Sequence, residues 1–587
     1  MSDSSYFDGL YQDSSIPILT RDQIKLKIAL GDVLVIHRSL VYKLNSWLNN
    51  HPGGQLSILH FVGRDATDEI EAYHPINVIK FMKPFIIARI NQDHIINQSF
   101  DLIWRPLNPP IQVGLWPMTP LKSIDNLMSF ESNFADCNQS SPSTSSSIGD
   151  LSILDSSSLS PSQTSNNSQG SCNSSSNSTL INRLHLLEPS SNQSQRDHDL
   201  SLERQKQLSL SYRALHDQIR AAGLYRAPQP FFGYGPDMIR YAILFTLFFL
   251  TSPLYYHSKK IFQTWFLNTL EPPILIPPST LRCFISAIFL GLYWHQITFV
   301  GHDAGHSGIT GDWKTDRLIG IFVGNFLCGL SIGWWCDNHD VHHLVTNHPE
   351  HDPDIQHLPF FAISTKFFQS LRSTYYKHTM RFNKFATSMV KHQHRFYYVI
   401  MFFARFNLLF NSYIYIAQRK EQRMRNLEIF GIIAFWFSFI AFLYLLPSNW
   451  IRVMFVLVSF GVTSPLHVQI VLSHFAQSTQ DLGLNESFAH RQIRTTMDVT
   501  CPPWLDFLHG GLHMQVTHHL FPRLPRHQLR FACEKFVRPW CQKEGLSYQS
   551  FKFVDGNLKV LGVLQDVANQ VKVLKLVALA QAKGEIH

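Results

Sequence analysis

The sequence predicts a soluble α+β domain joined to an all-α, polytopic membrane domain with four transmembrane helices. Apolar residues make up 45% of the 587 residues and charged residues only 16%, against roughly 25% charged residues in a typical soluble protein. Four apolar segments, all beyond residue 237, reach the length of about 20 residues that a bilayer span needs. Residues 16–95, in contrast, alternate short strand-like and helix-like runs, as a small soluble domain does.

Composition also excludes several classes of protein. The high apolar and low charged content excludes a coiled coil and disorder throughout the chain. Fifty Lys and Arg against 42 Asp and Glu give a net charge of +8, which is mild for this length, so we expect no nucleic-acid partner. The eight cysteines contain no CxxC pair, which argues against a disulfide framework and a zinc finger. Residues 1–15 lack the basic start and apolar core of a signal peptide.

The first candidate site lies in the small domain. His51 is followed by Pro-Gly-Gly, and His74 follows on a separate predicted loop. The Pro-Gly-Gly turn would present His51 from a rigid loop, and His74 would close the opposite face of a flat cofactor. A haem iron held by two histidines has no open position, so it carries electrons rather than binding oxygen. The alternative is a pair of ordinary surface histidines.

Residues 96–231 are predicted to link the two domains. Within them, residues 137–180 are rich in Ser and Asn. Such a composition cannot bury enough apolar surface to offset the entropy of ordering the chain, so we expect disorder there. A flexible tether and a phosphorylated regulatory segment are both compatible with this segment. Residues 182–225 are predicted to be helical and polar.

The membrane domain is expected to occupy residues 232–587. Its predicted spans are Met238–Tyr256, Leu281–Val300, Ile429–Leu446 and Trp450–Val471. Two further apolar runs are ambiguous, Leu318–Trp335 and Phe396–Phe410. The tail Leu558–Lys583 is compatible with an amphipathic helix on the membrane surface and equally with a terminal helix packed on the domain.

Three histidine clusters lie beside the predicted spans. They read HDAGH at 302–306, HDVHH at 339–343 and QVTHH at 515–519. Spacings of three and four residues place the rings of one cluster on one helix face. His474, just after the fourth predicted span, is a further candidate. Ionisable side chains in or near a bilayer need a partner, and the sequence therefore predicts a metal site with eight ligands, His302, His306, His339, His342, His343, His474, His518 and His519.

Topology tests whether the clusters can meet. Two clear spans separate the second cluster from the third, so both lie on one side of the membrane if the two ambiguous runs do not cross. Two spans also separate the small domain from His302, which places haem and metal on the same side. Arg419, Lys420, Arg423 and Arg425 mark that side as cytosolic. Lys259 and Lys260 fall on the opposite side.

The ligand type restricts the metal. Nitrogen ligands without cysteine clusters suit iron, zinc or copper, and eight imidazoles suit two ions. Zinc has no redox chemistry and would not use electrons from a haem domain, so iron is favoured, with O2 as oxidant. Side chains expected to orient the ligands through ring N–H groups are Asp303, Asn347, Asp352 and Asp354. Histidines interpreted as surface or supporting residues rather than ligands are His295, His351, His357, His467, His490, His509 and His527.

Both sites resemble known families. The run LNSWLNNHPGGQLSILHFVGRDATDEIEAYHP, residues 44–75, resembles cytochrome b5, which implies that His51 and His74 are the axial ligands of haem b. The three histidine clusters resemble the boxes of the membrane fatty-acyl desaturase family. Asp340 stands where related boxes often have Asn, and His513 is not counted as a ligand.

A narrower resemblance suggests the substrate. Gln515 in the third box and the fused haem domain resemble the front-end branch. Gln515 itself is a candidate for a weak or outer ligand. Residues 342–362 and 510–527 are most similar to fungal Δ8 sphingolipid desaturases. The resemblance implies an O2-dependent double bond at C8 of the long-chain base of a sphingolipid or ceramide. It further implies electrons from NADH through cytochrome b5 reductase, and an endoplasmic reticulum membrane with haem and iron on the cytosolic side.

Two alternatives remain open at this stage. The first is an acyl-lipid Δ5/Δ6 desaturase or a hydroxylase on the same scaffold, because metal ligands do not report where the substrate reacts. The second is an electron-transfer or metal-binding membrane protein without substrate chemistry.

Overall fold

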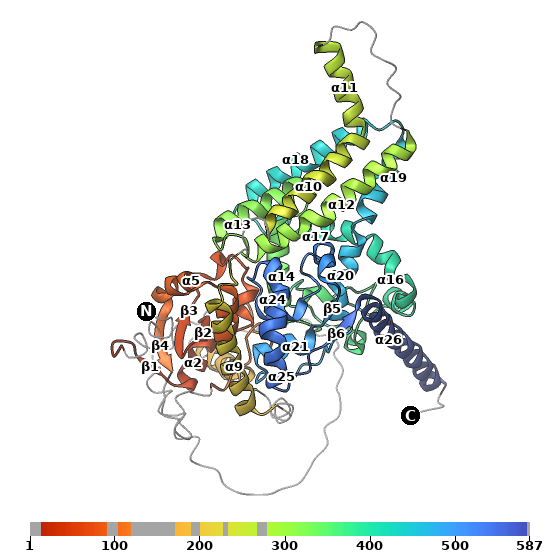
Figure 1. The fold of residues 1–587 in the computed structure, drawn as a ribbon. Helices are drawn as coiled ribbons and strands as arrows, with labels where there is room; N and C mark the ends of the chain where they lie inside the picture. The colour runs from red at the N-terminus through yellow and green to blue at the C-terminus, as the bar shows by residue number, and fades with distance from the viewer. Residues whose placement is uncertain are drawn as a thin grey trace, which may run out of the picture.

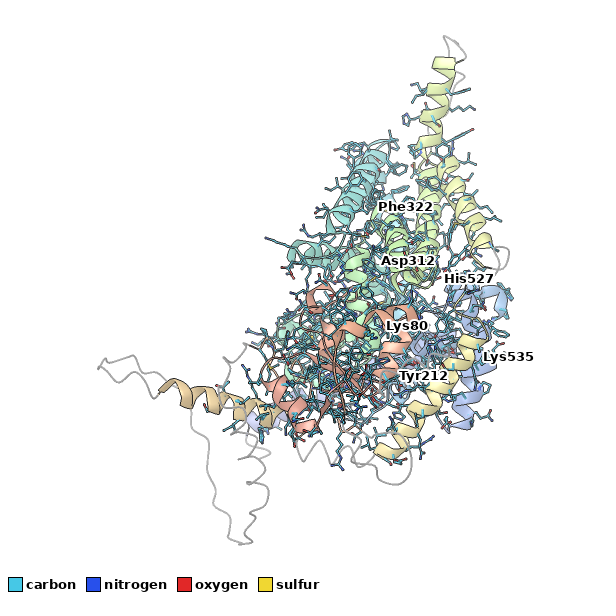
Figure 2. The ribbon with its side chains drawn as sticks, turned by 90° about the vertical axis from the view of Figure 1, so that its left-hand side faces the viewer. Lys80, Tyr212, Asp312, Phe322, His527 and Lys535 are labelled. Carbon is cyan, nitrogen blue, oxygen red and sulfur yellow. The ribbon has the colours of Figure 1, made fainter. Side chains whose placement is uncertain are left out.

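The computed structural model describes residues 13–90, 104–118, 171–189, 200–226, 233–266 and 279–583. Figure 1 shows a stem of long helices rising from a globular part, with the N-terminal domain on one side of that part and α26 projecting from the other. Figure 2, turned by 90°, shows Phe322 on the stem, and Lys80 and Tyr212 in the globular part.

The N-terminal domain is a four-stranded sheet with short helices. The strand order is β1-β4-β3-β2, with β1 and β4 parallel and the other pairs antiparallel. The strands are β1 (Ile18–Leu19), β2 (Leu34–His37), β3 (Leu40–Lys43) and β4 (Ile86–Ile90). The α-helices are α2 (Arg21–Ala29), α3 (Leu56–Leu59), α4 (Thr67–Tyr73) and α5 (Ile76–Phe81), with 3-10 turns η1 (Leu48–Asn50) and η2 (Lys83–Phe85).

Local sequence explains where these helices begin and what they bury. Thr20 caps α2 in a capping box with Gln23, which satisfies two N–H groups at the helix start. Ile24 and Ile28 of α2 are fully buried against Leu34 and Val41 of the sheet. His51 follows η1, and His74 follows α4.

The described parts of the predicted linker pack against the two flanking domains. Trp104 donates its indole N–H to the carbonyl of Gly63 at 2.9 Å. The helices are α7 (Ser171–Leu187) and α9 (Leu202–Ala221). The last ten residues of the segment predicted to be disordered belong to α7. Ordered structure begins there because Leu180 and Leu187 are buried against the N-terminal domain. Residues 119–170 lie outside the described residues, so most of the disorder prediction is untested.

The stem contains the apolar helices. They are α10 (Tyr234–Thr251), α11 (Pro253–Phe266), α12 (Thr280–Gly305), α18 (Arg425–Tyr444), α19 (Asn449–Gly461) and α20 (Ser464–Phe475). Among the described residues, three helical segments are long and apolar enough to cross a bilayer, and up to six if each bent pair is one span. The predicted count of four is therefore not confirmed. The first predicted span is broken, because α10 ends before Pro253 and α11 turns away by 71°.

The two ambiguous runs are both bent. One lies in α13 (Trp313–Gly320), the π-helical η3 (Ile321–Leu327) and α14 (Ile332–Leu344). The chain turns there by 115°. The other lies in α16 (Gln393–Phe402) and α17 (Ala404–Gln418), which meet at 68°. Arg405 at this bend is 2% exposed and donates to the carbonyl of Cys328 at 2.8 Å. Such bends suit segments that enter a membrane and return.

The C-terminal part closes the globular region below the stem. Its elements are η4 (Pro353–Ile355), η5 (Thr365–Gln369), α15 (Lys384–Val390), α21 (Phe488–Thr495), β5 (Asp498–Thr500), η6 (Pro503–Leu505), α22 (Asp506–His509), α23 (Gln515–Leu520), α24 (Arg526–Ala532), η7 (Cys533–Val537), α25 (Arg538–Lys543), β6 (Ser550–Lys552) and α26 (Phe553–Ala582). The first half of α26 is packed, with Val560 and Leu564 fully buried, whereas Leu576 near its end is 66% exposed. The tail thus has features of both predicted alternatives.

The N-terminal domain docks directly on the rest of the chain. Val341 and Leu344 of α14 belong to the same apolar core cluster as the N-terminal sheet. Asp68 of α4 forms a largely buried ion pair with Arg213 of α9, at 2.6 Å. The His-Pro-Gly-Gly turn lies against α14 so closely that a Cβ on Gly54 would meet the carboxylate of Asp337. The predicted linker helices and α14 therefore hold the two domains together.

Gly510 gives a stability test of the packing around α22. Its φ is +56°, and an added Cβ would lie 2.1–2.3 Å from the buried ring of Phe299 on α12. We expect Gly510→Ala to destabilise the protein by about 1–3 kcal/mol from overpacking, beyond the cost of the left-handed backbone. Thermal unfolding of the detergent-solubilised protein measures this effect. Gly223→Ala is the matched control, because Gly223 also has a positive φ of +72° but has open space around it. Equal melting temperatures for the two variants would contradict the proposed contact.

Candidate active site

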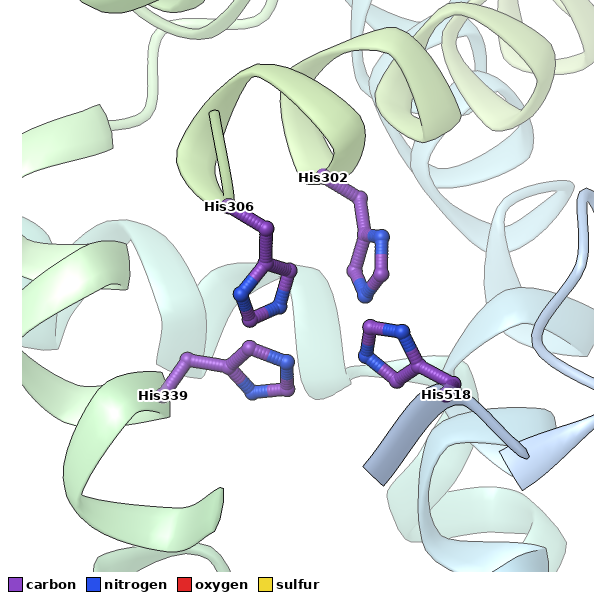
Figure 3. Close-up of side chains that lie close together, drawn as sticks. All are labelled: His302, His306, His339 and His518. Carbon is purple, nitrogen blue, oxygen red and sulfur yellow. The ribbon is translucent and has the colours of Figure 1, made fainter. Parts of the chain in front are cut away.

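Four histidines from three helices converge on one point. His302 and His306 come from the last turn of α12, His339 from α14 and His518 from α23 (Figure 3). One ring nitrogen from each lies within 4.8 Å of the others. The i, i+4 spacing of the first box brings its rings to 5.0 Å centroid separation, as the helix period requires.

A second group lies beside the first. His342 of α14, His474 of α20 and His519 of α23 are all buried, and their ring nitrogens also lie within 4.8 Å of one another. His343 joins the two groups. Its Nε2 is 3.0 Å from Nε2 of His339 and 3.1 Å from Nε2 of His518, and its ring stacks on His519 at 3.9 Å. All eight histidines predicted from the sequence therefore meet in one region.

The nitrogens of these rings fit a metal. Nε2 of His302, both ring nitrogens of His306, Nδ1 of His343 and Nε2 of His519 are buried without a hydrogen-bond partner in the described structure. Leaving a buried polar atom unpaired costs about 1–3 kcal/mol, and several in one place indicate a missing common partner. Burial holds the pKa of His518 and His519 well below the usual range. Neutral imidazole is the form that binds metal.

Hydrogen bonds behind the histidines orient the rings. Nδ1 of His342 lies 2.9 Å from Asp352, within hydrogen-bond distance, whereas the 3.6 Å between Nδ1 of His339 and Asp354 is too long for a hydrogen bond. An N–H donated to a carboxylate fixes the ring tautomer and leaves the other nitrogen free for a metal. His519 has the same arrangement with an amide, because its Nδ1 lies 2.9 Å from Oε1 of Gln492.

The remaining predicted supporting residues lie at different distances from the candidate ligands. Asp303 is 3.7 Å from Nδ1 of His302 and accepts a 2.5 Å bond from Arg526. Asn347 acts on the backbone, since its amide donates to the carbonyl of His474 at 2.9 Å. Gln515 is buried at the first position of α23, one turn before His518. Its predicted role as a weak or outer ligand stays a prediction.

His51 and His74 form the second predicted site. Their ring centroids are 6.0 Å apart. Two nitrogen–metal bonds of about 2 Å each, plus the distance from each ring centre to its nitrogen, add up to about this separation. Nδ1 of His51 pairs with the carbonyl of Gly54 and Nδ1 of His74 with that of Ile70, each at 3.0 Å. Burial lowers the pKa of His74 to about 3. Both rings are thus held with Nε2 available, which fits a haem iron between them.

The histidine pair adjoins the histidine groups. Tyr73 precedes His74 and lies edge-on to the ring of His343, with centroids 6.2 Å apart. On the other side, the turn after His51 rests on α14, which carries His339, His342 and His343. The chain therefore places the predicted electron donor next to the predicted oxidising centre.

The other histidines lie outside the two groups. His490 pairs with Glu486 at 2.8 Å and His527 with Asp237 at 3.0 Å. Four of the seven are nonetheless buried rather than on the surface, namely His295, His351, His467 and His509. His513 lies near Cys501 and Asp506, but Arg530 occupies that place, with two bonds to Asp506. Asp506 and Arg530 therefore form an ion pair, and this cluster is not a cation site.

Two supporting residues had no signal in the sequence. Gln492 also donates to the carbonyl of His343 at 2.7 Å, so it links two candidate ligands. The ring of Trp335 lies against that of His339, tilted by 31° with centroids 4.4 Å apart, and closes the first group from one side. A single Gln or Trp outside a motif gives no spacing from which such a role can be read.

Comparison with known proteins identifies the family. Residues 278–552 match the fatty acid desaturase family, and residues 20–91 match the cytochrome b5-like haem/steroid binding domain. A Delta 8-(E)-sphingolipid desaturase of Emericella nidulans is 39% identical over 95% of this chain and 96% of its own. Proteins with the same name from Komagataella phaffii and Candida albicans are 38% and 37% identical, over 95% and 97% of this chain and 94% and 99% of their own.

These matches cover both the histidine pair and the histidine groups, and they extend over almost the whole chain. They confirm the resemblance seen in the three boxes and in the turn around His51. The chain belongs to the fatty acid desaturase family, in the group of cytochrome b5-fused sphingolipid desaturases that these fungal proteins represent.

Proposed function

We propose that this protein introduces a trans double bond at C8 of the long-chain base of a sphingolipid. The observation that carries the proposal is the contact between a histidine pair suited to haem and two buried histidine groups suited to metal, on one chain. The full-length relatives named Delta 8-(E)-sphingolipid desaturase support the position and the geometry of the bond. An acyl-lipid Δ5/Δ6 desaturase or hydroxylase is not favoured.

We assign one histidine group to each of two iron ions. His302, His306, His339 and His518 hold one iron, and His342, His474 and His519 hold the other, with His343 between them. His51 and His74 hold haem b. The haem domain is residues 16–95, the linker is 96–231, and the catalytic domain is 232–587.

The overall reaction balances as follows. The substrate loses two hydrogen atoms from neighbouring methylenes, which amounts to two electrons and two protons. Two more electrons arrive through the haem domain, and two protons come from solvent. O2 accepts four electrons and leaves as two waters. Iron, when bound, supplies the O2 activation that this chemistry needs.

The chain's own residues prepare the site for that chemistry. The histidines are buried, so water is kept from a reactive centre. Asp352, fully buried, accepts from His342 and from the backbone N–H of Asn347 at 2.7 Å. It therefore fixes both the ring and the turn that follows α14. Tyr73 and the docked turn hold the haem-binding pair at a constant position relative to α14.

Asp352→Asn tests the role of this carboxylate. We expect about 10–100-fold weaker iron binding, because Asn has one carbonyl oxygen and loses the charge that favours a donating His342 ring. Iron content of the purified protein, titrated against a chelator, measures it. Asp481→Asn is the control, since Asp481 accepts from the backbone N–H of Gly483 and none of its described hydrogen bonds reaches a candidate ligand. Iron affinity unchanged in Asp352→Asn would remove Asp352 from the metal site.

We further propose the setting of the enzyme. Four crossings, with the two bent runs re-entering, place haem and iron on the cytosolic side of the endoplasmic reticulum membrane. Electrons come from NADH through cytochrome b5 reductase. The membrane helices and the basic segment before α18 support this orientation.

Expression in a yeast that lacks sphingolipid Δ8 unsaturation tests the function. We expect ceramides with one trans double bond at C8 of the long-chain base, located by mass spectrometry with double-bond cleavage. The vector without the gene is the control. Unsaturation in the acyl chain alone would refute the substrate and leave the desaturase family intact.

A further inference from the structure

A second set of buried histidines begins two helical turns before the candidate ligands. We call this set the polar level, and the depth of the candidate ligands the metal level. His295 precedes His302 by seven residues on α12, and His467 precedes His474 by seven residues on α20. Seven residues of α-helix rise about 10 Å and return to within about 20° of the same face. Both histidines therefore face the same side as the ligands that follow them, at a common distance. They are only 3% and 5% exposed.

A third element completes this level. Gln296 of α12 donates to the carbonyl of Phe507, and Gln469 of α20 donates to the carbonyl of His509, at 3.1 and 3.0 Å. Helix α22 is thus tied to both α12 and α20. Nδ1 of His509 is buried without a hydrogen-bond partner in the described structure. The two glutamine bonds place His509 beside the turns of α12 and α20 that carry His295 and His467.

The ring nitrogens at this level can serve a ligand. Nδ1 of His295 pairs with the side-chain N–H of Gln296 at 3.2 Å, so it accepts and Nε2 carries the proton. Nε2 of His467 contacts the hydroxyl of Thr463 at 3.3 Å, which leaves Nδ1 for another group. The level thus offers both donor and acceptor nitrogens, an arrangement that suits hydroxyl and amide groups.

Between the polar level and the metal level lies an apolar layer. Phe299 and Ile470 belong to this layer, and the same apolar cluster includes Leu512 and also Leu466, which precedes His467 directly. Phe299 lies between His295 and His302 in the chain, and Ile470 lies between His467 and His474. The order along the helices is therefore polar, apolar, metal.

The polar level lies within about two helical turns of the expected membrane boundary. Trp504, Phe507 and Leu508 around α22 are 71%, 42% and 40% exposed, and exposed aromatic residues mark the interface of a bilayer. From Thr280, about 20 residues of α12 span the hydrocarbon core, so the membrane boundary falls between His295 and His302.

We propose that His295, His467 and His509 bind the amide and hydroxyl groups at the polar end of the long-chain base. This inference rests on the proposed function and deepens it. An extended chain advances about 1.2 Å per bond, as a backbone advances 3.3–3.6 Å over three bonds. Six or seven bonds from the amide carbon to C8 and C9 then cover about 7–8 Å. With a hydrogen bond at the polar end, this matches the rise of about 10 Å from one level to the other.

The layering explains how a chain position is selected. The polar groups of the base are held by the three histidines of the polar level, the first methylenes cross the apolar layer, and C8 reaches the metal level. The distance is set by two helical turns, so it does not depend on the total length of the lipid. An acyl chain without the amide and hydroxyls lacks the groups that this level binds.

The test uses the purified full-length enzyme and a saturated ceramide as substrate. His295→Phe and His467→Phe keep the ring size and remove the polar atoms. We expect unchanged iron and haem content, a KM for ceramide at least about tenfold higher, and part of the product with its double bond displaced from C8. His378→Phe is the control, because His378 is exposed.

A second measurement needs no variant. A ceramide lacking the C3 hydroxyl is expected to have a raised KM with the wild-type enzyme, and to differ less from ceramide in the Phe variants. Equal KM values for the two lipids in the wild-type enzyme would overturn the inference, as would Phe variants with wild-type KM and product at C8 only. A wild-type enzyme that forms no C8 product would instead refute the proposed function.

Discussion

His306→Ala is expected to abolish desaturation and to lower the iron content of the protein. His306 ends α12, and its ring centroid lies 4.9–5.1 Å from those of His339, His343 and His518. Both of its ring nitrogens are buried and unpaired in the described structure. No neighbouring side chain replaces it, since the other histidines in reach already face the same point. Product analysis by mass spectrometry and iron determination on the purified variant measure the two effects.

The control for this variant is His378→Ala, which removes an exposed imidazole of the same domain. It should keep both iron and product. A haem spectrum identical to wild type in His306→Ala would show that the domain docked against α14 is intact. A variant that loses no iron and still forms product would contradict the assignment of the first histidine group.

Spacing in the sequence predicted which histidines lie together because the helix period acts locally. His302 with His306, and His339 with His342 and His343, share helix faces by spacing alone. The meeting of α12, α14, α20 and α23 required only that both ambiguous runs stay on one side. His474 was predicted from its position after a span, and the structure places it 4.5 Å from His342, between ring centroids.

Contacts between distant segments could not be predicted in this way. Gln492 reaches His519 from α21 across 27 residues, and Arg526 reaches Asp303 across 223 residues. The bend at Pro253 was also missed, because hydropathy continues through it while proline removes a backbone N–H. Sequence alone also did not divide the seven histidines interpreted as surface or supporting residues, of which four are buried, because hydropathy treats every histidine as polar.

His74→Ala is expected to remove haem from the full-length protein and to stop NADH-driven desaturation while iron stays bound. His74 follows α4, its Nδ1 is held by the carbonyl of Ile70, and its ring faces that of His51 at 6.0 Å. Alanine would leave one axial ligand, and the low-spin spectrum of a haem with two histidine ligands requires both. The absorbance spectrum, the iron content and the ceramide product are measured on the same preparation.

The matched control for this prediction is His60→Ala in the same domain. His60 is 1% exposed and its Nδ1 pairs with Gln112 at 3.1 Å, so its loss should lower stability and leave the haem spectrum unchanged. Tyr73 contacts His343 from the residue before His74, so the histidine pair lies directly beside the candidate iron ligands. Loss of haem together with loss of product, at constant iron, would therefore separate electron supply from substrate chemistry.

A normal low-spin spectrum in His74→Ala would refute the axial assignment. Full NADH-driven product without haem would mean that electrons reach the histidine groups by a route outside the N-terminal domain.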